Sequence, residues 1–257
     1  MKLATWNVNS IRARLDRLTS WLETYHPDVV CLQETKVEDG SFPFDPLKDL
    51  GYHVSHAGQK TYNGVAILSR EAPTDVRRGL DDGEDDPQAR LIGATVGGVR
   101  VISAYVPNGD EPGSPKFEYK LKWLSRLRRH LDTHYNARQP LILCGDFNVA
   151  PDERDVHDPA VWERTVLFNP EARSALVDVT RFGLIDTFRI HCQDPGKYSW
   201  WDYRMLAFPK NRGLRIDHVF ATAPLAEACR SASIDREARK GKQPSDHAPV
   251  LATFDTP

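Results

Sequence analysis

The chain has 257 residues, of which 40% are hydrophobic and 27% charged, and its formal net charge is −2. This length and composition are typical of a globular protein with a large core. The near-neutral charge excludes a globally basic nucleic-acid-binding protein, so any attraction to a polyanion must come from local patches or from a metal ion.

Four cysteines, none of them in a C-x-x-C pair, give no sign of a zinc site. Cys31 and Cys144 lie inside apolar runs, where a reduced buried thiol is the usual state. Polar residues between Asn7 and Arg12 interrupt the start before an apolar leader develops, and no apolar run approaches the length of a membrane span. We therefore expect a cytoplasmic protein with no membrane partner.

The first part of the chain alternates buried strands with helical patterns. Lys2–Asn7 is strand-like, and Ser10 is a suitable N-cap for a helix that runs to about Tyr25. A second buried strand, Asp28–Gln33, is followed directly by the carboxylate of Glu34. Phe42–Gly51 predicts a loop with one helical turn. Further strands are expected at Tyr52–His56, Gly64–Ser69, Leu91–Val96 and Val99–Tyr105, the last two joined by a Gly-Gly hairpin turn.

Charge dominates the next two segments. Five of the six residues in Asp81–Asp86 are acidic, which is typical of a solvated loop without a ligand role. Pro115–His134 is the longest helical pattern, with an apolar stripe that includes Leu121 and Leu124. Its many lysines and arginines are expected mostly to face solvent.

The central stretch is P-L-I-L-C-G-D-F-N-V-A-P at 140–151. Leu141–Gly145 is a short apolar run, as in a fully buried strand, and its glycine lets another group come close. Asp146 and Asn148 follow it. Side chains two residues apart on an extended chain point the same way, so these two would project together.

The last part of the chain begins with a predicted helix at Asn169–Phe182. Tyr198–Arg215 interleaves aromatic residues with cations and shows no helix or strand period. It could be a core with cations at its rim, but a loop suited to base stacking and phosphate contact is the better interpretation. Strands are expected at Ile216–Ala221 and Val250–Phe254. Before the last strand come the basic segment Arg236–Lys242 and S-D-H-A-P at 245–249.

Eight polar residues share one property, because each lies at or beside the end of a predicted strand. They are Asn7, Glu34, Tyr105, Asp146, Asn148, Asp217, Asp246 and His247. If these ends meet, four carboxylates share one pocket and could not stay ionised together without a compensating cation. Oxygen ligands without cysteine point to Mg²⁺ or Mn²⁺. Mg²⁺ leaves coordination sites for water and phosphate, which fits phosphodiester hydrolysis.

Simpler interpretations exist for single residues. Asp146 suits an Asx turn that ends a strand, and Glu34 could be a surface carboxylate. His247 could be an ordinary histidine that follows Asp246 by chance. Recurrence of the pattern at successive strand ends favours the shared pocket, in which Asp217 is the better candidate to orient the imidazole.

Six short motifs, kept in order from the first predicted strand to the last, make the sequence resemble the endonuclease/exonuclease/phosphatase superfamily. They are K-L-A-T-W-N-V-N-S at 2–10, C-L-Q-E-T-K at 31–36, A-Y-V-P-N at 104–108, C-G-D-F-N-V-A at 144–150, R-G-L-R-I-D-H at 212–218 and S-D-H-A-P at 245–249. L-Q-E-T-K and W-W-D-Y-R resemble the DNA-repair branch, the exonuclease III type of apurinic/apyrimidinic (AP) endonuclease. The resemblance implies one α/β domain over residues 1–257. Its fold would be a four-layer α-β-β-α sandwich, with helices flanking two packed mixed sheets as in deoxyribonuclease I.

The resemblance also implies a role for each metal-facing residue. Asn7 and Glu34 would hold a catalytic Mg²⁺, with Mn²⁺ as an alternative, and Asp246 would help directly or through water. Asp146 would orient or deprotonate the attacking water. Asn148 would bind a phosphate oxygen beside it, and both would lie within reach of the metal.

Three further residues would act on the phosphate. His247, held by Asp217, would stabilise the phosphorane-like transition state, and Tyr105 would contact the phosphate or the leaving group. Whether Asp146 or His247 is the general base stays open, as does the choice between one metal ion and two.

The DNA-facing positions follow from the same resemblance. Trp200, Leu214 and Ile216 match the lining of a pocket for a flipped-out abasic sugar, which costs little to extrude. Further contacts are expected at Tyr62, Asn63, Asn108, Asn211 and Arg212. The sequence departs from some relatives at Asn9, where they carry Asp, and in Gly109–Gly113, which lacks their DNA-inserting Arg.

The implied function is Mg²⁺-dependent cleavage of duplex DNA on the 5′ side of abasic sites, with 3′–5′ exonuclease and 3′-end-cleaning activity. The partner would be double-stranded DNA with an abasic site or a recessed or blocked 3′ end, and we expect a monomer. The alternatives are a specialised 3′ exonuclease of the same branch and a superfamily phosphatase acting on lipid or inositol phosphates. A catalytically dead binding module is a further alternative, against which the intact set of acids argues.

Overall fold

The computed structural model describes residues 1–255, which form two six-stranded β-sheets. The first sheet has the order β11-β12-β1-β2-β4-β3, with bounds β1 (Lys2–Asn7), β2 (Val29–Gln33), β3 (His53–Ala57), β4 (Val65–Ser69), β11 (Cys229–Ile234) and β12 (Val250–Phe254). The second has the order β5-β6-β7-β8-β10-β9, with bounds β5 (Thr74–Arg78), β6 (Leu91–Val96), β7 (Val99–Tyr105), β8 (Leu141–Asp146), β9 (Leu184–Asp186) and β10 (Asp217–Thr222).

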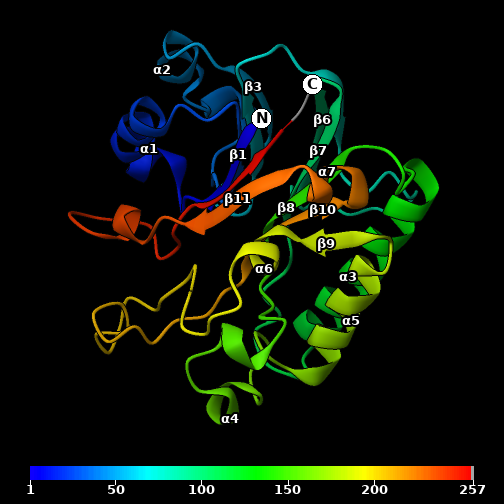
Figure 1. Ribbon diagram of the computed structural model, residues 1–257, viewed down its shortest axis with the longest axis vertical. Coiled ribbons are helices and arrows are strands. Elements are labelled where there is room, and N and C mark those ends of the chain that lie inside the picture. Colours follow the sequence, from blue (N-terminus) through cyan, green and yellow to red (C-terminus); the bar gives the residue numbers. More distant parts are fainter. Residues whose placement is uncertain (256–257) are drawn as a thin grey trace.

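The two sheets pack against each other, and helices cover their outer faces (Figure 1). The longer helices are α1 (Ile11–Tyr25), α2 (Phe44–Asp49), α3 (Pro115–His134) and α5 (Pro170–Thr180). The shorter ones are α4 (Pro159–Trp162), α6 (Thr187–His191) and α7 (Ala223–Glu227), with 3₁₀ turns η1 (Asp39–Ser41), η2 (Glu153–Asp155) and η3 (Arg236–Arg239). Helices α1 and α2 lie on the first sheet, and α3 and α5 on the second. The expected four-layer order is confirmed.

Residues that line the space between the sheets are small or β-branched, such as Val29, Cys31, Ile142 and Cys144. Such side chains suit the close packing of two pleated surfaces. Gly145 permits a close approach within the second sheet, because a Cβ there would lie 1.9 Å from the carbonyl oxygen of Ala104 on β7. No helix among residues 1–255 combines the length and the apolar character needed to cross a lipid bilayer.

Each sheet contains a parallel pair of strands joined by a helix. Helix α1 connects β1 to β2, and α3 connects β7 to β8. The carboxyl ends of each parallel pair therefore meet at one edge, where Asn7 pairs with Gln33 and Tyr105 with Asp146. β10 runs antiparallel to β8 and brings its first residue, Asp217, opposite Asp146. This topology places polar residues from distant parts of the sequence at one edge.

The expectation that the basic residues of α3 face solvent is wrong for two of them. The spacing of Phe117, Lys120 and Leu124 places Lys120 on the buried face of the helix, where its side chain is fully covered. Arg126 is also buried, and it donates to carboxylate oxygens of Asp82 at 2.7 and 2.9 Å. The acidic run at 81–86 is therefore partly a structural counter-charge and not only a solvated loop.

Candidate active site

The Asn7 amide lies where the two sheets meet. Its Nδ2 donates to Glu34 Oε1 and to Asp146 Oδ2, both at 2.9 Å, while its Oδ1 accepts from the backbone N–H of Asn9. Tyr105 donates its hydroxyl to the same Glu34 oxygen at 3.0 Å. These side chains come from the ends of β1, β2, β7 and β8. The amide joins a carboxylate of one sheet to a carboxylate of the other.

His247 lies on the other side of Asp146. Its Nδ1 is 2.9 and 3.1 Å from the two carboxylate oxygens of Asp217, and its Nε2 is 3.7 Å from Asp146 Oδ2. Ser199 donates its hydroxyl to Asp217 at 2.6 Å and accepts from the Asp217 backbone N–H. Because Asp217 holds Nδ1, the ring presents Nε2 to the Asp146 side of the site.

Burial and neighbouring charges set the protonation of this group. Burial raises the pKa of Asp146 to about 7, and the charges of Asp217 and Glu34 act in the same direction against the opposing His247. Burial lowers the pKa of His247, but the Asp217 and Asp146 carboxylates outweigh it and raise that pKa to about 10. At neutral pH the imidazole is therefore protonated, and the Asp146 carboxyl is close to its own pKa.

Glu34 has a different environment. Burial would raise its pKa, but the Lys36 ammonium, whose Nζ lies 2.8 Å from Glu34 Oε2, and the Asn7 amide lower it overall. Lys36 also donates to Asn9 Oδ1 at 2.6 Å. Glu34 therefore stays ionised, and one of its oxygens faces a cation of the chain itself.

The donor atoms fit a hard divalent cation. One ligand atom each from Glu34, Asp146 and His247 lies within 4.8 Å of the others. The carboxylate oxygens of Glu34 and Asp146 are the candidate ligands, and none of the four cysteines, all within residues 1–255, takes part in the contacts of the site. The raised pKa of Asp146 means that its charge lacks full compensation within the chain, which a bound cation would supply.

Asp246 orients an aromatic wall. Its Oδ1 accepts from Asn9 Nδ2 at 2.9 Å and its Oδ2 from the indole N–H of Trp200 at 3.0 Å. The Trp200 backbone forms isolated β-bridges with Leu214 and His247, which ties this wall to the imidazole. Leu214 and Ile216 are almost fully buried.

Two asparagines continue the site beyond β8. The Asn148 backbone N–H donates to Asp146 Oδ1 at 2.9 Å, and its side chain donates to the Val106 carbonyl at 3.0 Å. Asn108 donates its amide to Asn148 Oδ1 at 3.1 Å. Asn148 adopts a left-handed backbone with φ of 50°, which asparagine tolerates better than most residues.

The five further positions expected to contact DNA divide into two groups. Tyr62 is 67% exposed, and Asn108 and Arg212 are also exposed. The other two turn inward, because Asn63 donates to Gln59 and Gln88, and the Asn211 amide oxygen accepts from the indole N–H of Trp201. Trp201 is itself fully buried. The segment at 198–215 is thus a loop, as expected, but part of it forms a small core.

Sequence reasoning missed two residues of the site. Lys36 lies two positions after Glu34, so the spacing E-x-K could have indicated the ion pair. Ser199 gave no signal, because a lone serine in an aromatic segment is unremarkable until the fold brings its hydroxyl to Asp217.

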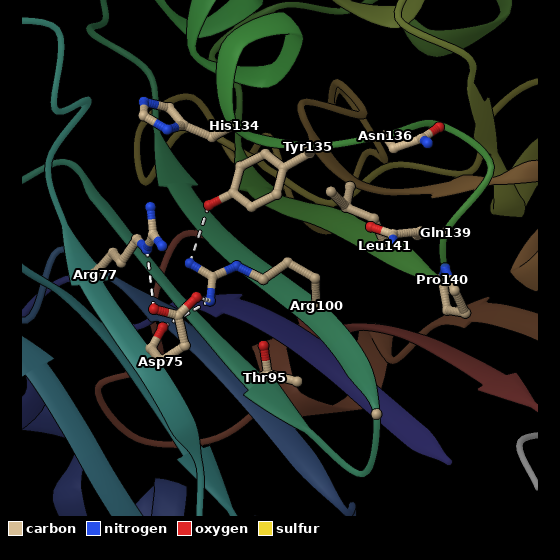
Figure 2. A pocket seen from close by; sticks show the side chains of 11 residues that line it. Asp75, Arg77, Thr95, Arg100, His134, Tyr135, Asn136, Gln139, Pro140 and Leu141 are labelled. Atoms are coloured by element: carbon tan, nitrogen blue, oxygen red, sulfur yellow. Dashed lines mark hydrogen bonds and ion pairs between the residues drawn. The ribbon is translucent and has the colours of Figure 1, made fainter.

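A separate cavity of about 350 Å³ lies at the opposite end of the second sheet, beside the start of β7 and β8 (Figure 2). Arg100 lines it and donates to the backbone carbonyl of Asp75 at 2.7 Å and to the Tyr135 hydroxyl at 3.0 Å. Arg77 pairs with the Asp75 carboxylate. The cations of this cavity already have partners within the chain, and we assign it no role in the chemistry.

Comparison with known proteins adds family information to this geometry. A family model described as the endonuclease/exonuclease/phosphatase family matches residues 4–247. Exodeoxyribonuclease III of Haemophilus influenzae is 38% identical over 99% of this chain and 100% of its own length. The structure of an AP endonuclease from Archaeoglobus fulgidus is 43% identical with a TM-score of 0.97, and a 3′–5′ exonuclease from Neisseria meningitidis is 42% identical with a TM-score of 0.95. Both matches cover 100% of this chain and 100% of the other chain.

Proposed function

The chain belongs to the endonuclease/exonuclease/phosphatase family, and we propose that it is a Mg²⁺-dependent DNA-repair phosphodiesterase that incises duplex DNA on the 5′ side of abasic sites. Trimming and cleaning of 3′ ends by the same site belong to this proposal. The observation that carries it is the meeting of Glu34, Asp146 and the His247–Asp217 pair at one edge of the two sheets. Full-length similarity to proteins named exodeoxyribonuclease III and AP endonuclease supports DNA as the substrate.

Both sheets supply residues to this site, so we propose that the chain works as one domain. Glu34 and Asp146, whose carboxylates both accept hydrogen bonds from the Asn7 amide, would hold Mg²⁺, which would neutralise negative charge on the phosphate. Asp246 would support this metal site indirectly, because it accepts a hydrogen bond from Asn9, which in turn donates to Asn7.

The residues of the chain itself supply orientation, charge and proton transfer. Protonated His247, fixed at Nδ1 by Asp217, directs its Nε2–H toward charge that develops on the phosphoryl oxygens. Asp146 accepts the proton of the attacking water, a role that its position between the Asn7 amide and His247 Nε2 allows. Tyr105, which donates to Glu34, and the hydrogen-bonded pair Asn108–Asn148 are the further polar side chains beside the two carboxylates.

Selectivity for damage would come from the wall beside His247. Trp200 is held in place by Asp246, and Leu214 and Ile216 are packed behind it. A stiff apolar wall favours a small sugar without a base over a full nucleotide, which would need more space and more unstacking energy. Exposed Tyr62 and Arg212 are available to contact the DNA backbone.

A specialised 3′ exonuclease is the second candidate. It is favoured by the 42% identity to the Neisseria meningitidis 3′–5′ exonuclease, which is nearly the same as the identity to the AP endonuclease. The same metal and histidine chemistry serves both reactions. The two differ in whether an internal abasic site or a strand end enters the site.

One experiment decides between them. A 5′-labelled duplex with a single abasic site is incubated with the protein in Mg²⁺ or in EDTA, beside a matched duplex with a recessed 3′ end. Mg²⁺-dependent incision 5′ to the lesion supports the main proposal. Loss of 3′ nucleotides without incision supports the second candidate. Turnover of a phosphoinositide, with no DNA product, would overturn both.

A further inference from the structure

Lys120 is a buried lysine that the proposed mechanism does not use. Burial lowers its pKa to about 7, and the charge of Asp146 opposes this lowering. Its side chain is fully covered in the middle of α3, and among residues 1–255 no carboxylate forms an ion pair with it. Its Nζ donates instead to three backbone carbonyl oxygens, those of Asn108 at 3.0 Å, Asn148 at 2.7 Å and Val166 at 2.7 Å. A buried charge must be hydrogen-bonded to be tolerated, and this one is satisfied by the backbone.

The three carbonyls match the chemistry of an ammonium group. A protonated lysine has three N–H donors and no acceptor, so each donor finds one oxygen. The oxygens belong to three separate loops, namely the loop after β7, the loop after β8 and the loop between α4 and α5. Lys120 therefore links three loops from different parts of the sequence.

Two of the three loops carry side chains of the site. Asn108 and Asn148 are hydrogen-bonded to each other through their amides, and the Asn148 N–H donates to Asp146 Oδ1. The Lys120 ammonium donates to the backbone carbonyls of both asparagines. The Asn148 carbonyl and the Asn148 N–H belong to adjacent peptides, so a shift of that carbonyl would move the Asn148 backbone and its hydrogen bond to Asp146.

We propose that Lys120 is a positioning residue for phosphodiester cleavage, which sets Asn108 and Asn148 in register with Asp146 through its three-carbonyl cage. This inference rests on the proposed function. Lys120 would not touch the substrate, so its effect must pass through the two asparagines.

The first test replaces Lys120 with methionine, which keeps the stem and removes the ammonium. The matched control is Lys122→Met on the same helix, because Lys122 is exposed and forms a surface ion pair with Glu84. We expect Lys120→Met to lower kcat on an abasic duplex by about 10- to 100-fold with KM changed by less than about 3-fold, since small misplacements of reacting groups carry losses of this size. A kcat within about 3-fold of wild type would overturn the proposal.

A double-mutant cycle separates positioning from general stability. If Lys120 acts through the asparagines, Lys120→Met combined with Asn148→Ala should be no slower than Asn148→Ala alone, within about 3-fold. Losses that multiply would show that Lys120 acts independently of Asn148 and would overturn the proposal. Should Lys120→Met fail to fold, Lys120→Arg keeps the charge but cannot fit the same cage, and it is expected to lose at least about 10-fold in kcat; wild-type kcat in that variant would count against the cage.

A crystal structure of the folded variant tests the inference without activity. Displacement of the Asn108 and Asn148 backbone relative to Asp146 supports it, and unchanged positions overturn it. Wild-type cleavage of the duplex is measured in parallel. Failure of the wild type to cut DNA would overturn the proposed function, whereas failure of this inference would leave wild-type cleavage intact.

Discussion

Replacing Asp146 with asparagine should raise stability while it removes activity. Burial raises the pKa of Asp146 from 3.8 to about 7. A carboxyl group with a raised pKa in the folded state destabilises the protein above that pKa, and the destabilisation disappears as the pH falls below the unfolded value. A shift of roughly 3 pKa units corresponds to about 4 kcal/mol of free energy of unfolding. At pH 8 the metal-free wild type should be less stable by this amount than it would be without the shift.

The substitution also introduces one poor contact. An asparagine Oδ1 can still accept from the Asn148 N–H, but the new amide nitrogen would replace the oxygen that accepts from Asn7 Nδ2. Two donors would then face each other, at a cost of about 1–3 kcal/mol. We therefore expect Asp146→Asn to be more stable than wild type by about 1–3 kcal/mol at pH 8 in EDTA. At pH 4 the gain should be absent.

The assay is urea unfolding of both proteins in EDTA at pH 8 and pH 4, together with incision kinetics in Mg²⁺. Asp110→Asn is the control, because its carboxylate is 59% exposed and forms a surface ion pair with Lys116. We expect Asp146→Asn to lose at least about 100-fold in kcat, as removal of a general base does. A variant that is less stable than wild type at pH 8, or that keeps a tenth of its activity, would refute this reasoning.

Three further outcomes follow from the contacts of single residues. Burial and the Arg215 charge lower the pKa of His218 to about 4, so the folded state should lose stability as the pH falls from 6.5 toward 4. In urea unfolding, His218→Gln should reduce this dependence of stability on pH. Arg126→Met should destabilise the fold by about 3–5 kcal/mol at pH 7, because Asp82 and Asp86 lose a buried partner. Thermal unfolding measures the loss of stability, and a loss under about 1 kcal/mol would contradict the prediction. Asp217→Asn should lower kcat on an abasic duplex by about 100-fold or more with little change in KM, since His247 loses the partner that fixes its ring; an unchanged kcat would show that this pair is not needed.

The fold was predictable where a segment is long and strongly periodic. Leu91–Val96, Val99–Tyr105 and Pro115–His134 have the expected bounds, and Gly97 and Gly98 both adopt the positive φ of a tight hairpin turn. The exposed edge strand β5, Thr74–Arg78, was missed because no apolar alternation marks it. Its place depends on pairing with β6, which a local pattern does not contain.

The sequence predicted which residues belong to the site better than it predicted the contacts between them. Residues at successive strand ends, such as Glu34 and Asp146, are indeed brought together, because each sheet joins a parallel pair through a helix. What the sequence did not show are contacts between loops and elements that lie far apart in the sequence. Burial of Lys120 under the site loops and the hydrogen bond from Ser199 to Asp217 are examples.

A magnesium titration of incision tests the central claim most directly. Single-turnover cleavage of the 5′-labelled abasic duplex is measured for wild type, Glu34→Gln and the exposed control Glu38→Gln. The account predicts that EDTA abolishes cleavage and that Glu34→Gln raises the half-saturating Mg²⁺ concentration by about 10-fold or more, as loss of one charged ligand does. The control should match wild type. Cleavage that persists in EDTA, or an unchanged half-saturation in Glu34→Gln, would contradict a metal-dependent site built on Glu34 and Asp146.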